Sequence, residues 1–171
     1  MIQKLKENEI ENMKRVERIR RHPLYIENYE KNVMSEKTRI FCHHDMSHFL
    51  DVARLAYIFS LERNYSLKKD IIYAAALLHD IGKWKQYADK TPHEIASSKI
   101  AELILTECQF DSKEREQILT AIRSHRQMGE TKDPLSEVLY LADKLSRPCF
   151  SCPAEKECNW SESKKNLKIL W

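Results

Sequence analysis

The sequence Ile71-Ile-Tyr-Ala-Ala-Ala-Leu-Leu-His79-Asp80-Ile-Gly82-Lys83 decides the fold. Its apolar part has no polar side, which predicts that the helix expected at 67–81 is central and buried. Burying an imidazole and an ionised carboxylate directly after this run costs several kcal/mol unless a partner compensates, and a metal cation is the natural partner. The alternative is a helix that ends at the surface, where His79 interacts with the helix dipole and Asp80 caps a turn at Gly82.

The composition predicts an all-α protein. The chain has 171 residues, which fits one domain with a proper core, and only 2 of them are glycine. So little glycine excludes glycine-rich phosphate loops, and the absence of Asn-Gly and Asp-Gly turns argues against β-hairpins. We expect a single compact helical bundle of about six to eight helices. In it, N-terminal helices at 1–36 pack on a core at 37–147, and a cysteine-containing loop with a short C-terminal helix at 148–171 completes the same domain.

Apolar periodicity and capping residues give the expected helix bounds. Thr91, Pro92 and Glu94 form a helix start with a capping box, and Asp111 with Glu114 repeats that signal. The expected helices are 2–21, 24–36, 45–61, 67–81, 91–107, 111–126, 133–145 and 161–170.

The charge balance gives little support for a nucleic-acid groove. There are 29 Lys and Arg against 26 Asp and Glu, interspersed along the chain, for a net charge of +3. The longest apolar run is far shorter than the ~20 residues that a membrane span needs, and the first residues are too polar for a signal peptide. Five cysteines, an odd number, indicate reduced thiols and a cytoplasmic protein with no membrane partner. A monomer and a homodimer are both open.

Further histidines share the inward faces of the expected helices. His48 lies four residues before Val52, and His125 lies in the last turn of the helix at 111–126. His93 lies in the first turn of its helix, where the positive end disfavours imidazolium and keeps a nitrogen lone pair available. Asp143 lies at the edge of an apolar stripe. One such histidine is more often a satisfied core residue, but together with His79 and Asp80 they indicate a shared metal site.

Three motifs resemble the HD superfamily of metal-dependent phosphohydrolases, all-helical enzymes with the pattern H…HD…D. They are His48-Phe-Leu-Asp-Val-Ala-Arg54, Ala76-Leu-Leu-His79-Asp80-Ile-Gly82-Lys83 and Tyr140-Leu-Ala-Asp143-Lys-Leu145, and the resemblance covers roughly 40–147. It implies an HD-domain bundle whose metal ligands are His48, His79, Asp80 and Asp143. His93 and His125 match the extra histidines of members that hold two metals, such as dinucleoside polyphosphate hydrolases, in which Asp80 would bridge the ions.

The resemblance implies a hydrolase that cleaves a phosphoester or phosphoanhydride of a small phosphorylated metabolite, a nucleotide or dinucleotide, by attack of a metal-activated water. Ligands of this type suit one or two divalent ions of Fe, Mn, Co, Ni or Zn. Asp80 and Lys83 are the catalytic candidates, and Lys83 is best placed to neutralise phosphate. Further candidates for substrate binding, each of which could equally be a solvated surface residue, are His44, Arg54, Arg126, Lys144 and Arg147. The alternative functions are a non-catalytic module that senses a nucleotide or metal, and an HD-type di-iron oxygenase.

Cysteines follow the core with the spacing Cys-x2-Cys-x5-Cys. Cys149 and Cys152 match half a zinc knuckle, and with Cys158 they could anchor an iron–sulfur centre. No fourth ligand is evident nearby, and Cys42 could supply one only if the fold brings it there. The alternative is a set of reduced thiols that pack locally with Trp160.

Overall fold

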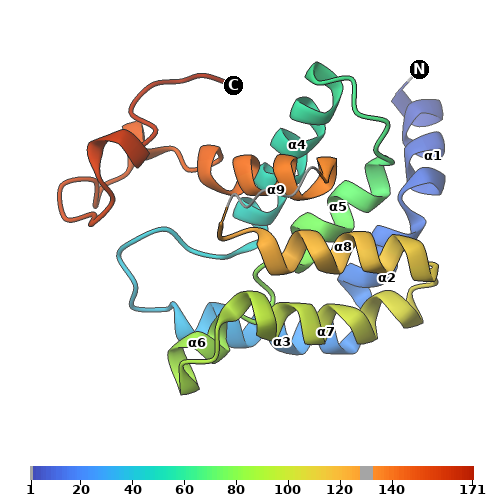
Figure 1. Cartoon of the computed structure of the whole chain (residues 1–171), viewed down its shortest axis with the longest axis horizontal. Coiled ribbons are helices and arrows are strands. Elements are labelled where there is room, and N and C mark those ends of the chain that lie inside the picture. The colour runs from blue at the N-terminus through green and yellow to red at the C-terminus, as the bar shows by residue number, and fades with distance from the viewer. Residues whose placement is uncertain (1, 128–132) are drawn as a thin grey trace.

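Helices make up the regular structure of residues 2–127 and 133–171, the part of the chain that this computed structural model describes (Figure 1). No strand occurs among those residues, so the expected all-α class is confirmed. The helices are α1 (Ile2–Asn12), α2 (Lys14–Arg21), α3 (Pro23–Ser35), α4 (Met46–Glu62), α5 (Lys69–Leu78), α6 (Lys83–Asp89), α7 (His93–Glu107), α8 (Ser112–Ser124) and α9 (Pro134–Leu145). Two short 3₁₀ turns follow, at Cys149–Ser151 and Glu162–Lys164.

Helix α5 lies at the centre of the bundle, as its sequence predicts. It packs against α2, α4, α7, α8 and α9. Every residue from Ile71 to Leu78 is buried except Tyr73, which is half-buried. Removing a side chain such as Ile72 from so dense a contact region would cost about 2–5 kcal/mol. The C-terminal end of α5 therefore delivers His79 and Asp80 into the interior, where both are buried.

The N-terminal segment differs from the single helix expected at 2–21. The chain bends at Met13, whose backbone leaves the helical region at φ −107° and ψ 11°. The bend lets Val16 and Ile19 of α2 pack into the core, while the described side chains of α1 stay exposed. Burial of one apolar stripe, and not helix propensity, therefore decides the path of this segment.

The predicted capping box at Thr91 is wrong. Helix α7 begins after Pro92, with no side-chain hydrogen bond at its N-cap, and the Thr91 amide donates to Asp89 at the end of α6 (3.0 Å). The Glu94 carboxylate instead accepts a hydrogen bond from Arg126, which explains why the capping box does not form. The matching prediction for α8 is confirmed, because Asp111 and Glu114 form both capping-box hydrogen bonds.

The expected C-terminal helix at 161–170 is also wrong, because only the 3₁₀ turn Glu162–Lys164 forms there. The Asn166 side chain donates to the backbone carbonyls of Lys144 (2.8 Å) and Arg147 (3.0 Å), so the segment is held against the end of α9 in a non-helical form. At its end, Trp171 packs edge-on against Phe59 of α4, with ring centroids 5.0 Å apart.

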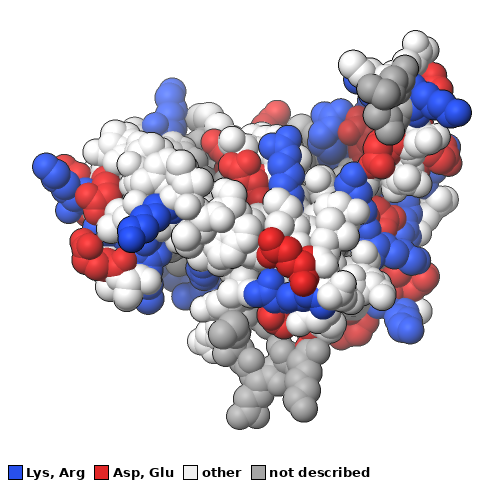
Figure 2. Space-filling model, turned by 90° about the horizontal axis from the view of Figure 1, so that it is seen from above, with Lys and Arg blue, Asp and Glu red and all other residues white. Residues whose placement is uncertain are grey.

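The surface matches the interspersed charge of the sequence. On the face that Figure 2 draws, Lys and Arg side chains alternate with Asp and Glu and form no large field of one sign. Among the described residues, no helix is both long and apolar enough to span a bilayer.

Candidate metal centre

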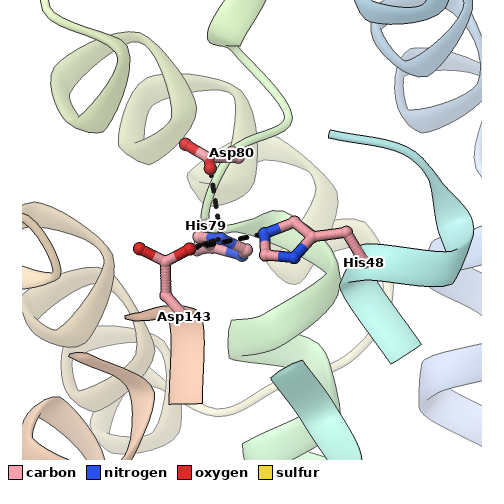
Figure 3. A group of neighbouring side chains, drawn as sticks. All are labelled: His48, His79, Asp80 and Asp143. Atoms are coloured by element: carbon pink, nitrogen blue, oxygen red, sulfur yellow. Dashed lines mark ion pairs between the residues drawn. The ribbon is translucent and has the colours of Figure 1, made fainter. Parts of the chain in front are cut away.

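Four buried side chains from three parts of the bundle point toward one another (Figure 3). His48 lies on α4, His79 and Asp80 follow α5, and Asp143 lies near the end of α9. One ligand atom from each lies within 4.8 Å of the others. The geometry therefore brings together distant residues into a set of two imidazoles and two carboxylates, which is a chemically suitable donor set for a divalent ion.

A second group shares Asp80 with the first. His93, the first residue of α7, and His125, at the end of α8, each offer an atom within 4.8 Å of Asp80. The Oδ1 atom of Asp80 lies 3.1 Å from Nε2 of His93 and 3.5 Å from Nε2 of His125. Its Oδ2 atom lies 3.2 Å from Nε2 of His79. One carboxylate thus faces two separate imidazole groups with its two oxygens.

The imidazole protons are directed away from this cluster. Nδ1 of His79 and Nδ1 of His125 each donate to the backbone carbonyl three residues earlier, at 2.7 and 2.6 Å. Nδ1 of His93 donates to Oε1 of Gln86 at 2.5 Å. With the proton on Nδ1, the neutral form of each ring directs its Nε2 lone pair at Asp80, as a metal ligand would.

Inside the cluster, imidazole lone pairs face carboxylate oxygens, so both sides are hydrogen-bond acceptors and neither has a donor. Nε2 of His79 and Oδ1 of Asp80 have no hydrogen-bond partner, and both residues are buried. Buried polar atoms are nearly always satisfied, and orphaned ones require an explanation. A cation between these atoms satisfies them, so the residues present fit a metal site.

The pKa values of the clustered histidine and aspartates are shifted because these side chains lie so close together. Burial alone would lower the pKa of His79, but the carboxylates of Asp80 and Asp143 outweigh burial and raise it. Burial alone would raise the pKa of each aspartate, but the imidazoles hold both well below their usual range. Positive charge at this position is therefore favoured, and a bound metal ion would displace the proton of His79.

The HD domain family model matches residues 46–147. This chain belongs to the HD domain family. An uncharacterized protein of Clostridium beijerinckii is 45% identical to it over 147 residues, which cover 86% of this chain and 92% of that protein. No solved structure is a significant match to the chain. The HD domain places the protein in a superfamily of metal-dependent phosphohydrolases, and its buried His and Asp cluster fits the metal site that this family uses.

Basic side chains contact two of the candidate metal ligands. Lys144 donates to Oδ2 of Asp143 at 2.5 Å. Arg147 is buried and donates to Nε2 of His48 at 3.0 Å and to the backbone carbonyl of His43 at 2.8 Å. Lys144 therefore offsets the charge of Asp143, and both basic residues line the cavity beside the cluster.

His44 lies inside the HD domain site and not on the surface. Its Nε2 atom is 3.5 Å from Oδ2 of Asp80, and its Nδ1 donates to Oε1 of Glu36 at 2.5 Å. Oε2 of Glu36 accepts from the His44 amide at 2.7 Å, and Oε1 also accepts from the Tyr87 hydroxyl at 2.7 Å. Sequence reasoning missed Glu36, since no local pattern distinguishes it from the many exposed glutamates.

The HD turn itself is held by residues that sequence reasoning also missed. Asn32 of α3 is fully buried and bonds the backbone on both sides of the turn, at Asp80 and at Trp84. Gly82 lies so close to α7 that a Cβ there would be 2.6 Å from the amide nitrogen of Ser97 and 2.8 Å from the carbonyl carbon of Ala96. The family string contains this glycine, but only the structure gives its physical reason.

A cavity of about 630 Å³ opens beside the cluster of the HD domain. Seven Lys or Arg side chains and three carboxylates line it, so basic side chains are in excess even when Asp80 and Asp143 are counted. Lys83 lies in it, with Nζ 3.3 Å from Nδ1 of His93 and with a pKa that burial lowers. The other expected substrate contacts that line it are His44, Arg126, Lys144 and Arg147. Arg54 lies elsewhere on the surface, where it is exposed and pairs with Asp51 at 3.8 Å.

Proposed function

We propose that this HD domain is a phosphohydrolase that cleaves a phosphoester or phosphoanhydride of a small metabolite, a nucleotide or dinucleotide. The observation that supports it best is Asp80, whose two buried oxygens face two separate imidazole groups. A carboxylate in that position suits a bridge between two divalent ions. The cavity beside it has the size of ordinary small-molecule sites and an excess of basic side chains, as a phosphorylated ligand requires.

The residues that would hold the ions form two sets that share Asp80. The first set is His48, His79, Asp80 and Asp143, and the second is Asp80, His93 and His125. Neutral imidazole nitrogens and carboxylate oxygens suit Fe, Mn, Co, Ni or Zn. Bound there, such ions supply a Lewis acid for a phosphoryl oxygen and lower the pKa of a coordinated water.

The cavity side chains would bind and orient the phosphoryl group. Lys83 follows Asp80 by one turn and directs its ammonium group into the cavity near His93, where it can neutralise phosphate charge. Lys144 donates a hydrogen bond to Asp143 and Arg147 donates one to His48, and both basic residues line the same cavity. A bound phosphate could accept hydrogen bonds from them in place of these partners. Arg126 is paired with Glu94 and exposed, which suits a contact at the edge of the substrate.

Elemental analysis of untagged protein, purified without chelators, tests the proposal first. Apart from any iron that accompanies acid-labile sulfide, we expect about two ions of Fe, Mn, Co, Ni or Zn per chain, and a loss of these ions in Asp80→Ala. The matched control is Asp51→Ala, which removes an exposed carboxylate from α4 and should leave the metal content unchanged. Metal-loaded protein should then release phosphate from some member of a panel of nucleotides and dinucleotides, and Asp80→Ala should release none.

Three outcomes would contradict the proposed phosphohydrolase function. Metal-dependent turnover that persists in Asp80→Ala would remove Asp80 from the reaction. Tight nucleotide binding without turnover under any of the metals would indicate a sensing module. Oxygen consumption by iron-loaded protein, without phosphate release, would indicate a di-iron oxygenase.

A further inference from the structure

Four cysteines line the cavity, although they come from distant parts of the chain. Cys149, Cys152 and Cys158 lie in the segment after α9, and Cys42 lies in the loop before α4. Figure 1 draws that loop in cyan, on the same side of the molecule as the C-terminal segment in red. The fold thus brings a fourth thiol to the Cys-x2-Cys-x5-Cys motif, which the sequence spacing alone does not do.

Specific hydrogen bonds hold the two segments together. The Arg147 guanidinium donates to the backbone carbonyl of His43 at 2.8 Å, next to Cys42. Arg39 donates to the carbonyl of Cys42 itself at 3.0 Å. The Arg147 bond joins the loop before α4 to the start of the cysteine segment, and the Arg39 bond fixes the backbone of that loop at Cys42.

The cysteine segment is folded tightly around its own thiols. Three successive backbone turns join Cys149 to Cys152 (3.2 Å), Cys152 to Glu155 (3.2 Å) and Glu155 to Cys158 (3.3 Å). Lys165 then donates to the backbone carbonyl and the carboxylate of Glu155, at 2.9 and 2.6 Å. These hydrogen bonds hold a loop that has little regular structure, and each of the three turns begins or ends at a cysteine.

The thiols are all free, and their closeness makes each of them harder to ionise unless a metal is bound. No disulfide joins any of the five cysteines. Burial raises the pKa of Cys42, the neighbouring Cys152 and Cys149 thiols raise it further, and the Arg147 guanidinium opposes them. Thiolates that converge in this way repel one another unless a cation holds them, which is the usual reason for such a cluster in a reducing compartment.

We propose that Cys42, Cys149, Cys152 and Cys158 hold an iron–sulfur cluster in the wall of the cavity, as a second metal centre that is separate from the histidine and aspartate site. A single zinc ion, with Zn–S bonds of about 2.3 Å, would need sulfurs about 3.8 Å apart. In the described part of the chain no three cysteine sulfurs lie mutually within 4.8 Å. A [4Fe–4S] cluster inserts its own iron and sulfide between the thiolates and so needs a wider arrangement.

The surroundings match the charge of such a centre. Arg39, Lys164 and Lys165 line the same cavity and offset the negative charge of four thiolates. Cys149 is buried and the other three cysteines are half-buried, which shields a cluster from solvent while leaving it accessible to assembly. Cys108, the fifth cysteine, follows α7 and does not line the cavity.

The full chain, purified without oxygen, tests this inference by its content of acid-labile sulfide. The histidine and aspartate site binds no sulfide, so labile sulfide and its visible charge-transfer absorption report on the cysteines alone. After treatment with ferrous iron and sulfide we expect one [4Fe–4S] cluster per chain, retained in Cys108→Ala and in Asp80→Ala. Cys42→Ala and Cys158→Ala should lose most of the sulfide.

Circular dichroism and the metal content of the histidine and aspartate site check that the cysteine variants fold. Absence of labile sulfide in the reconstituted wild type would overturn the cluster, and so would one zinc ion per chain bound by these cysteines. Equal cluster content in folded Cys42→Ala would overturn the role of Cys42. Because Asp80→Ala should keep the cluster, failure of the proposed hydrolase and failure of this inference are distinguishable.

Discussion

The side-chain amide of Asn32, in α3, donates a hydrogen bond of 2.8 Å to the backbone carbonyl of Asp80. Its Oδ1 atom accepts from the Trp84 amide, also at 2.8 Å, so one fully buried side chain spans the turn that presents Asp80. Helix α3 precedes the residues that the HD domain model matches, 46–147. The N-terminal helices therefore help to position the site and do more than cover the core.

Asn32→Ala removes both of these bonds and leaves buried backbone groups without partners. We expect a loss of about 2–6 kcal/mol in the free energy of unfolding, since each of the two unsatisfied groups costs about 1–3 kcal/mol. Urea unfolding measures this loss, and metal affinity should fall with it because the turn loosens. Asn12→Ala, at the exposed end of α1, is the matched control. A stability equal to that of the control would show that the turn is held by other contacts.

Gly82→Ala places a methyl group against the backbone of α7. The Cβ would lie 2.6 Å from the Ser97 nitrogen, and backbone atoms cannot move aside cheaply. We expect a loss of about 1–3 kcal/mol in unfolding free energy, as for other overpacked sites. Because α7 begins with His93, the metal content should also fall. Ser35→Thr, which adds a methyl at the exposed end of α3, should change neither quantity.

His125→Ala separates the two ligand sets, since His125 belongs only to the second. We expect the metal content of the histidine and aspartate site, counted without iron–sulfur iron, to fall from about two ions per chain to about one, while Asp80→Ala lowers it further. Elemental analysis of the variants, prepared in parallel, measures this. His43→Ala, an exposed histidine beside the site, should match the wild type. If His125→Ala keeps all its metal, His93 and His125 only support a single ion.

Glu36→Gln tests the buried pair of Glu36 and His44 through its pH dependence. Burial alone would raise the pKa of Glu36, but bonds from His44 and Tyr87 lower it from 4.5 to about 2. Because the pKa is lower in the folded state, ionised Glu36 stabilises the fold above pH 4.5, and this contribution disappears as the pH falls toward 2. Wild type should therefore lose more stability across that window than Glu36→Gln does.

Urea unfolding at a series of pH values measures the difference between the two proteins. Glu30→Gln, at an exposed glutamate of α3, which ends just before Glu36, controls for the loss of one charge and should follow the wild type. Parallel curves for wild type and Glu36→Gln would mean that the Glu36 carboxylate has the same pKa in the folded and unfolded chains.

Local patterns predicted the helices where apolar burial or a cap is strong. The run that ends at Leu78 predicted the buried helix α5, and Asp111 with Glu114 predicted the start of α8. The same kind of signal failed at Thr91, because Glu94 finds a partner in Arg126, 32 residues away. It failed again in the expected helix at 161–170, because Asn166 bonds the end of α9. Each failure has a long-range contact as its cause.

The sequence by itself determined the all-α class and the candidate ligands, since periodic burial and the HD motifs are properties of neighbouring residues. Only the tertiary structure decided that the oxygens of Asp80 face His79 on one side and His93 on the other. It also decided that Glu36 orients His44 and that Cys42 meets the cysteine loop. These relationships join residues on different elements, and helix packing, which no local pattern encodes, sets their distances.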